Sequence, residues 1–179
     1  MRALSTSTSA KRVATWGVLV SVAMVLSYVE SVVSLGITLP GVKLGLCHLV
    51  TLYALYRMKV SDVWLTAVLR VALMGMLFGN MVSLAYSGAG CVCSIAVMCL
   101  LSRCKGFSMV GVSVAGGVAH NIGQLACAAL LMQTKGLLWY LPVLLVAGCV
   151  CGVVVGLLGA WIVHRLPQTT SCTKEDTSI

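Results

Sequence analysis

Acidic side chains are scarce in this sequence. Of its 179 residues only four are aspartate or glutamate, and all charged residues together make up 9%, whereas hydrophobic residues make up 60%. Such a composition excludes an ordinary soluble domain and indicates a membrane protein with several spans. Each charge that interrupts an apolar run therefore needs a specific explanation.

The sequence also lacks the motifs of several enzyme classes. It has no GxxxxGK[ST] phosphate loop, so any ATP hydrolysis would have to come from partner subunits. Its three histidines are too scattered for a metal-binding motif. We therefore expect neither a catalytic site nor a resident metal or cofactor in this chain.

Cysteine is plentiful, with nine residues, but its placement indicates packing. Most of the cysteines lie in or beside apolar runs, where a free thiol packs as a small hydrophobic group. Cys91 and Cys93 lie near the predicted outer face, without the second matched pair that would indicate a zinc site. The sequence leaves open whether an outer disulfide forms.

Six apolar runs divide the chain, which predicts an all-α integral membrane protein with a bundle of six transmembrane helices. The predicted spans cover residues 13–35, 43–56, 61–81, 84–101, 108–134 and 138–164. A basic N-terminus, residues 1–12, precedes this membrane domain, residues 13–165, and a polar tail, residues 166–179, follows it. The second span is short, and at 1.5 Å per residue it needs help from the preceding segment to cross the roughly 30 Å hydrocarbon core.

Basic residues predict the orientation of the bundle. Nine lysines and arginines fall on one side of the predicted spans, and only Lys43 and Lys135 fall on the other. By the positive-inside rule, both termini are expected in the cytoplasm. The net charge of +8 would suggest nucleic acid as the partner of a soluble protein, but charges placed between apolar runs indicate membrane topology instead.

A set of polar residues lies at membrane depth. Arg70 lies near the middle of the third span, where an arginine costs about 2.5 to 3.5 kcal/mol and normally faces the bundle interior. Counting residues from the span ends places most of the set in the outer half, around a cavity that closes near Arg70 and His120. The residues predicted to bind a small solute there are Glu30, Lys43, His48, Arg70, Asn80, His120, Asn121 and Gln124.

A purely structural interpretation stays open for these residues. Polar groups in membrane helices often only hydrogen-bond to neighbouring helices, at about 0.6 kcal/mol each. Arg70 and Glu30 could form an architectural ion pair, and Lys43 could be an ordinary lysine that reaches the outer headgroups.

Segment 36–46 interrupts the helical pattern. Pro40 removes a backbone donor, and Gly41 and Gly45 loosen the chain, so no continuous helix is expected through it. Broken segments beside a short span often line binding sites in transporters, because free helix N-termini there can face anionic groups. Lys43 would add positive charge at this point.

Small residues recur in the sixth span. Gly148, Gly152, Gly156 and Ala160 repeat at four-residue spacing and form a smooth face that another helix can approach closely. Packing within the bundle is the favoured interpretation, ahead of dimerisation.

Three stretches of the chain carry a family resemblance. They are LPGVKLGLCHLVTLYALY at residues 39–56, AHNIGQL at residues 119–125 and YLPVLL at residues 140–145. They resemble the bacterial family labelled heptaprenyl diphosphate synthase component I, which is also called the Gx transporter family. That family is grouped with the substrate-binding S components of energy-coupling-factor vitamin importers. The resemblance implies a six-span protein of the bacterial inner membrane, although Cys47 and His48 stand where the family usually has Ala-Asn.

The importer relationship implies one function. The chain would be the solute-binding part of an importer of vitamin-like compounds, energised by a transmembrane coupling subunit and ATPases. S components commonly dock through small residues on the first spans, and the loose counterpart here is Ala10, Ala14, Gly17 and Ser21. This is the function that we expect from the sequence.

The synthase name implies the alternative, a membrane accessory subunit in isoprenoid or quinone synthesis. Prenyl chain elongation needs aspartate-rich motifs that bind magnesium and, through it, the diphosphate. This chain has only Asp62 and Asp176, which are far apart in the sequence. It cannot be the catalytic prenyltransferase by itself.

Overall fold

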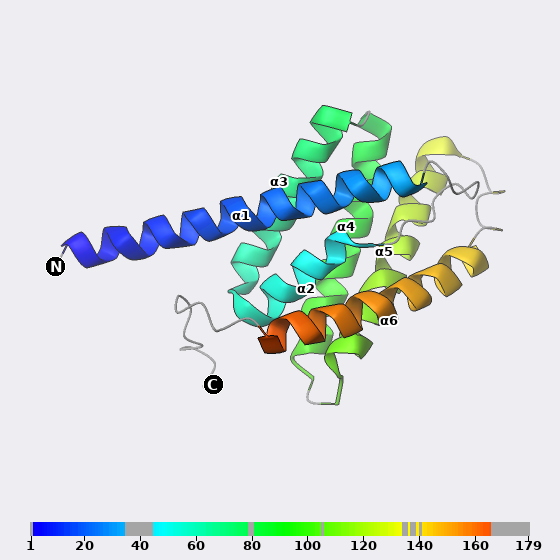
Figure 1. The fold of residues 1–179 in the computed structure, drawn as a ribbon. Helices are drawn as coiled ribbons and strands as arrows, with labels where there is room; N and C mark the ends of the chain where they lie inside the picture. The colour runs from blue at the N-terminus through cyan, green and yellow to red at the C-terminus, as the bar shows by residue number, and fades with distance from the viewer. Residues whose placement is uncertain are drawn as a thin grey trace.

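Six helices make up most of the chain that the structure describes (Figure 1). The computed structural model describes residues 2–34, 45–78, 81–104, 106–133, 136, 139 and 141–165. The helices are α1 (Arg2–Ser34), α2 (Cys47–Arg57), α3 (Val60–Phe78), α4 (Met81–Ser102), α5 (Met109–Met132) and α6 (Leu141–Arg165). No strand occurs within these residues, and the predicted all-α fold is confirmed.

Five of the described helices are long and apolar enough to cross a membrane. Their outward faces carry large apolar side chains, such as Met76, which is 80% exposed, and Leu130, which is 79% exposed. An apolar outer surface of this extent suits contact with lipid. The chain is thus a multi-pass membrane protein.

The second predicted span is longer than the helix found there. α2 has 11 residues and is not among the helices long enough to cross a membrane. The first four residues of that predicted span are Lys43, Leu44, Gly45 and Leu46, of which the first two lie outside the described residues. Gly45 and Leu46 precede the helix, so the described part of this span is only a short helical insert between longer helices.

Local signals define the ends of α5 and the start of α6. The Ser108 side chain accepts a hydrogen bond from the Gly111 backbone N–H at 3.2 Å, which caps the first turn of α5. Gln133 follows the last residue of α5 in the left-handed conformation, with φ of 49°. Pro142 occupies the first turn of α6, where its missing N–H would have no helical partner.

The helices pack in a chain of neighbours. α4 lies against α5, and α5 lies against α6, while α3 packs on α4. α1 contacts α2 and α3 and runs obliquely across them, with its first turns extending beyond the other helices (Figure 1). The short α2 contacts α1, α3, α5 and α6, so it lies in the interior of the bundle.

Glycines bring α5 and α6 close together. Gly148, Gly152 and Gly156 all face α5, and a Cβ on Gly152 would lie 2.6 Å from a backbone Cα of that helix. No side chain fits at such a distance, so the two backbones are in direct contact along this seam. Ala160 is half-buried, and the small residue that meets α2 is its neighbour Gly159.

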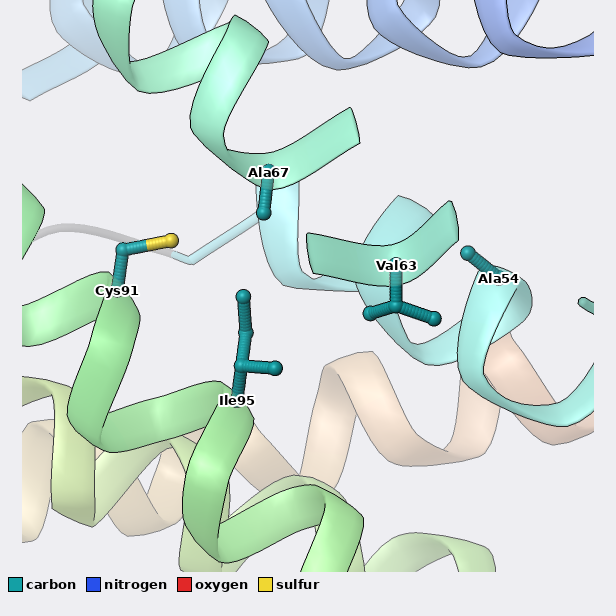
Figure 2. Close-up of a cluster of buried hydrophobic side chains, with 5 residues drawn as sticks. All are labelled: Ala54, Val63, Ala67, Cys91 and Ile95. Atoms are coloured by element: carbon teal, nitrogen blue, oxygen red, sulfur yellow. The ribbon is translucent and has the colours of Figure 1, made fainter. Parts of the chain in front are cut away.

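A cluster of small, buried side chains joins α2, α3 and α4 (Figure 2). Its members are each at most 5% exposed, and they are Ala54, Val63, Ala67, Cys91 and Ile95. Since lipid is as apolar as these side chains, close packing, more than exclusion of water, holds the three helices together.

Polar contacts tie the helices together at the end of the bundle where α2 and α6 finish and α3 begins (Figure 1). We call this the basic end. Arg12 of α1 forms an ion pair with Asp62 of α3, whose side chain is only 2% exposed. The Arg57 guanidinium donates a hydrogen bond to the Val163 carbonyl in the last turn of α6, where a cation also suits the helix dipole.

Candidate functional site

A polar cavity of about 220 Å³ lies in the half of the bundle away from the basic end. All six helices contribute to its lining. The ionisable and amide side chains that line it are Glu30, His48, Arg70, His120 and Asn121. Because charged groups are costly at membrane depth, their gathering around one cavity is the principal chemical feature of the molecule.

Glu30 anchors the turn that leads into α2. Its buried carboxylate accepts a hydrogen bond from the Gly45 backbone N–H. Gly45 has φ of +71°, a conformation that a glycine adopts without strain, and its carbonyl accepts from the His48 N–H at 2.8 Å. Glu30 therefore fixes the turn that places His48 at the cavity wall.

Arg70 lies at the cavity with weak partners. Its side chain is 8% exposed, Nη1 lies 3.4 Å from the Ser27 hydroxyl oxygen, and Nη2 lies 3.7 Å from the Cys91 sulfur. The contact with Ser27 is long for a hydrogen bond and the thiol is a weak acceptor, and Nε has no partner within the described residues. Arg70 and Glu30 form no ion pair within 4 Å in the described residues, although Glu30 is near enough to attract the guanidinium.

Two histidines meet at the cavity. The rings of His48 and His120 lie 4.8 Å apart between centroids and nearly perpendicular, at 79°. His48 is buried, and its Nδ1 has no hydrogen-bond partner within the described part of the chain. Gly90 of α4 makes room for His120 of α5, since a Cβ there would lie 2.8 Å from the His120 carbonyl oxygen.

The remaining predicted site residues do not all line the cavity. Asn121 lines the cavity but also donates a hydrogen bond to the Leu144 carbonyl at 2.7 Å, which links α5 to α6. Gln124 is buried, yet it is absent from the described residues that line the cavity. Lys43 and Asn80 lie outside the described residues. A binding role for the whole set stays a prediction.

Three serines at the cavity were not predicted from the sequence: Ser27, Ser87 and Ser113. Ser27 precedes Glu30 by three residues, so the two share a helix face, and this spacing could have revealed it. Ser113 precedes His120 by seven residues, again on one face. Ser87 carried no such signal.

No disulfide joins any of the cysteines in the described residues. The possibility of an outer disulfide involving Cys91 and Cys93 is therefore not realised among them. Cys91 is buried beside Arg70, while Cys93 packs against the α5 backbone where Gly123 leaves space.

A family comparison covers the entire cavity. The family model described as heptaprenyl diphosphate synthase component I matches residues 19–162. Every residue that lines the cavity falls within this range. No curated protein and no solved structure matches the chain.

Proposed function

Because the chain belongs to the heptaprenyl diphosphate synthase component I family, we propose that it is a non-catalytic membrane subunit that binds a small polar solute and acts with partner proteins. The observation that carries this proposal is the polar cavity inside an otherwise apolar bundle. Ionisable residues that face such a cavity typically belong to solute sites. A purely architectural set would be expected to satisfy its own hydrogen-bond donors, whereas Arg70 Nε has no partner within the described residues.

The family description supports the accessory role better than the importer role that we expected from the sequence. In this role the chain would bind its solute while assisting a separate prenyltransferase. The chain offers no aspartate-rich magnesium site for catalysis, since Asp62 pairs with Arg12 at the basic end, away from the cavity.

An importer subunit is the second candidate, and two observations favour it. The cavity occupies the half opposite the basic end, which would face outward if the basic end is cytoplasmic. In addition, Ala10, Ala14, Gly17 and Ser21 all lie exposed on α1, where a coupling subunit could contact them. As an importer subunit, the protein would lie in a bacterial inner membrane with both termini in the cytoplasm.

A matched pair of variants tests the proposed binding role. Ser87→Phe places a large side chain at the cavity wall, whereas Val92→Phe places the same side chain on an exposed, non-lining face of α4. Each full-length protein would be purified gently from its native membranes, and retained small molecules would be identified by mass spectrometry. We expect a solute with the wild type and with Val92→Phe, and its loss with Ser87→Phe.

The proteins that copurify distinguish the two candidates. An aspartate-rich prenyltransferase supports the accessory role, whereas a transmembrane coupling subunit with ATPases supports the importer. Equal solute content in both phenylalanine variants, with each variant folded, would refute binding in this cavity.

A further inference from the structure

Arg70 brings a charge into the bundle that its surroundings leave under-compensated. An arginine is protonated under all ordinary conditions, and this one is 8% exposed. Its described contacts are a hydroxyl at 3.4 Å and a thiol at 3.7 Å, and no carboxylate of the described residues lies within ion-pair distance. A buried cation without a close anion is costly, unless a ligand supplies that anion.

The hydrogen-bonding capacity of the guanidinium is also unused in part. Arg70 Nε has no partner within the described residues, although the side chain lines the cavity. A planar guanidinium binds a carboxylate through two parallel N–H donors, which is among the strongest neutral-pH polar contacts in proteins. His48 Nδ1, likewise without a partner in the described chain, adds a second polar group at the wall.

The volume limits the size of the ligand. A cavity of roughly 150 Å³ holds one benzene, so the 220 Å³ found here suits a compact molecule with on the order of nine non-hydrogen atoms. A heptaprenyl chain of seven isoprene units is far larger than this cavity.

The charge of the cavity limits the class of anion. Glu30 lines the same cavity and attracts Arg70 from beyond ion-pair distance, so a doubly charged phosphate would add two negative charges beside this carboxylate, whereas a monocarboxylate adds only one. We infer that the cavity selects compact organic monocarboxylates, with the Arg70 guanidinium binding the ligand carboxylate. This inference rests on the proposed function and adds the ligand class.

Three probes of equal size and planar shape test the inference: benzoate, benzamide and benzamidine, which are anionic, neutral and cationic. Thermal unfolding of the full-length protein in mild detergent would be measured against the concentration of each probe, since a ligand that binds the folded state raises its melting temperature. We expect benzoate to bind with a dissociation constant roughly tenfold or more below that of either analogue.

Variants assign the effect to Arg70. Arg70→Met should raise the dissociation constant of benzoate roughly tenfold or more, and Arg70→Lys, which keeps the charge but loses the planar fork, should give an intermediate value. Arg103→Gln is the control, because it removes one positive charge from an exposed position at the opposite end of α4. If Arg70→Met fails to fold, the dissociation constant of benzoate for the Arg70→Lys protein still tests the inference.

The inference is overturned if benzamide or benzamidine binds as well as benzoate, if inorganic phosphate binds more tightly, if benzoate does not bind, or if the Arg70 variants bind benzoate as the wild type does. A neutral or cationic solute retained by the natively purified protein would also overturn it. That last result would leave the proposed binding function intact, whereas equal solute content in Ser87→Phe and Val92→Phe would refute the function itself.

Discussion

Two arginine environments differ within the described part of this molecule. At the basic end, the half-buried Arg12 forms an ion pair with the buried carboxylate of Asp62, and Arg57 donates a hydrogen bond to a helix carbonyl. In the opposite half, the buried Arg70 contacts the Ser27 hydroxyl and the Cys91 thiol among the described residues, beside a cavity. Arginine thus clamps helices together in one half and lines a cavity in the other.

Glycine contacts also differ, but by helix pair and not by half. α5 and α6 touch backbone to backbone at Gly156 near the basic end and at Gly152 beside the cavity. At Gly75 of α3, by contrast, the nearest atoms belong to the side chain of Leu84. Glycine contacts with a backbone leave no room for adjustment, whereas a side chain beside a cavity can move.

The largest effect on stability is expected from breaking the ion pair between Arg12 and Asp62. Arg12→Met should lower the free energy of unfolding by about 3 kcal/mol, because it leaves the Asp62 carboxylate buried without its partner. Chemical denaturation in mixed micelles measures this, with the exposed neighbour Lys11→Met as the control. The double variant Arg12→Met/Asp62→Asn should regain most of the loss, and a loss no larger than that of Lys11→Met would contradict the clamp.

A pair of alanine substitutions compares a backbone contact with a side-chain contact. Gly156→Ala should cost about 2 kcal/mol, because its Cβ would lie 2.7 Å from a backbone Cα of α5 and the helices would have to separate. Gly75→Ala should cost less than about 1 kcal/mol, because the Leu84 side chain can turn toward the cavity. The same denaturation assay applies, and equal losses would mean that both contacts are equally rigid.

Replacing Arg70 should have a smaller effect on the stability of the ligand-free protein. Arg70→Met removes an under-compensated charge and keeps most of the volume, so the free energy of unfolding should change by less than about 1 kcal/mol. Chemical denaturation without ligand measures this free energy, with Arg12→Met measured in the same assay for comparison. A loss as large as that of Arg12→Met would make Arg70 a structural clamp as well.

Topology can be tested with little effect on stability. In a background lacking other cysteines, Trp139→Cys, between α5 and α6, should react with a membrane-impermeant maleimide in intact cells, because Trp139 is 87% exposed at the end away from the basic residues. Cys104 retained alone, at the α4–α5 connection, should react only after permeabilisation. The reverse labelling pattern would invert the orientation.

Helix positions followed closely from hydropathy. The predicted span 84–101 corresponds to α4, Met81–Ser102, and the predicted span 108–134 corresponds to α5, Met109–Met132. Hydropathy is summed along a single helix, so it needs no knowledge of neighbouring helices. The prediction was less accurate at α2, since Gly45 and the turn before the helix shorten it and Glu30, from another helix, holds that turn.

The spacing of the site residues along each helix was predictable from the sequence, but the direction in which each side chain faces was not. Counting along each span placed His120 and Gln124 one turn apart, yet only His120 lines the cavity. The serine partner of Arg70 was missed for the same reason, because Ser27 lies on another helix. Spacing within a helix indicates which residues share a face but not which neighbour that face meets.

The sequence by itself determined the membrane class and the six helices, because apolar length and charge act locally along the chain. Only the tertiary structure decided that Arg70 lacks Glu30 as a direct partner and that both line one cavity with two histidines. With 3.6 residues per turn, a shift of one residue rotates a side chain by about 100°, so contacts between helices depend on rotations that no single helix encodes.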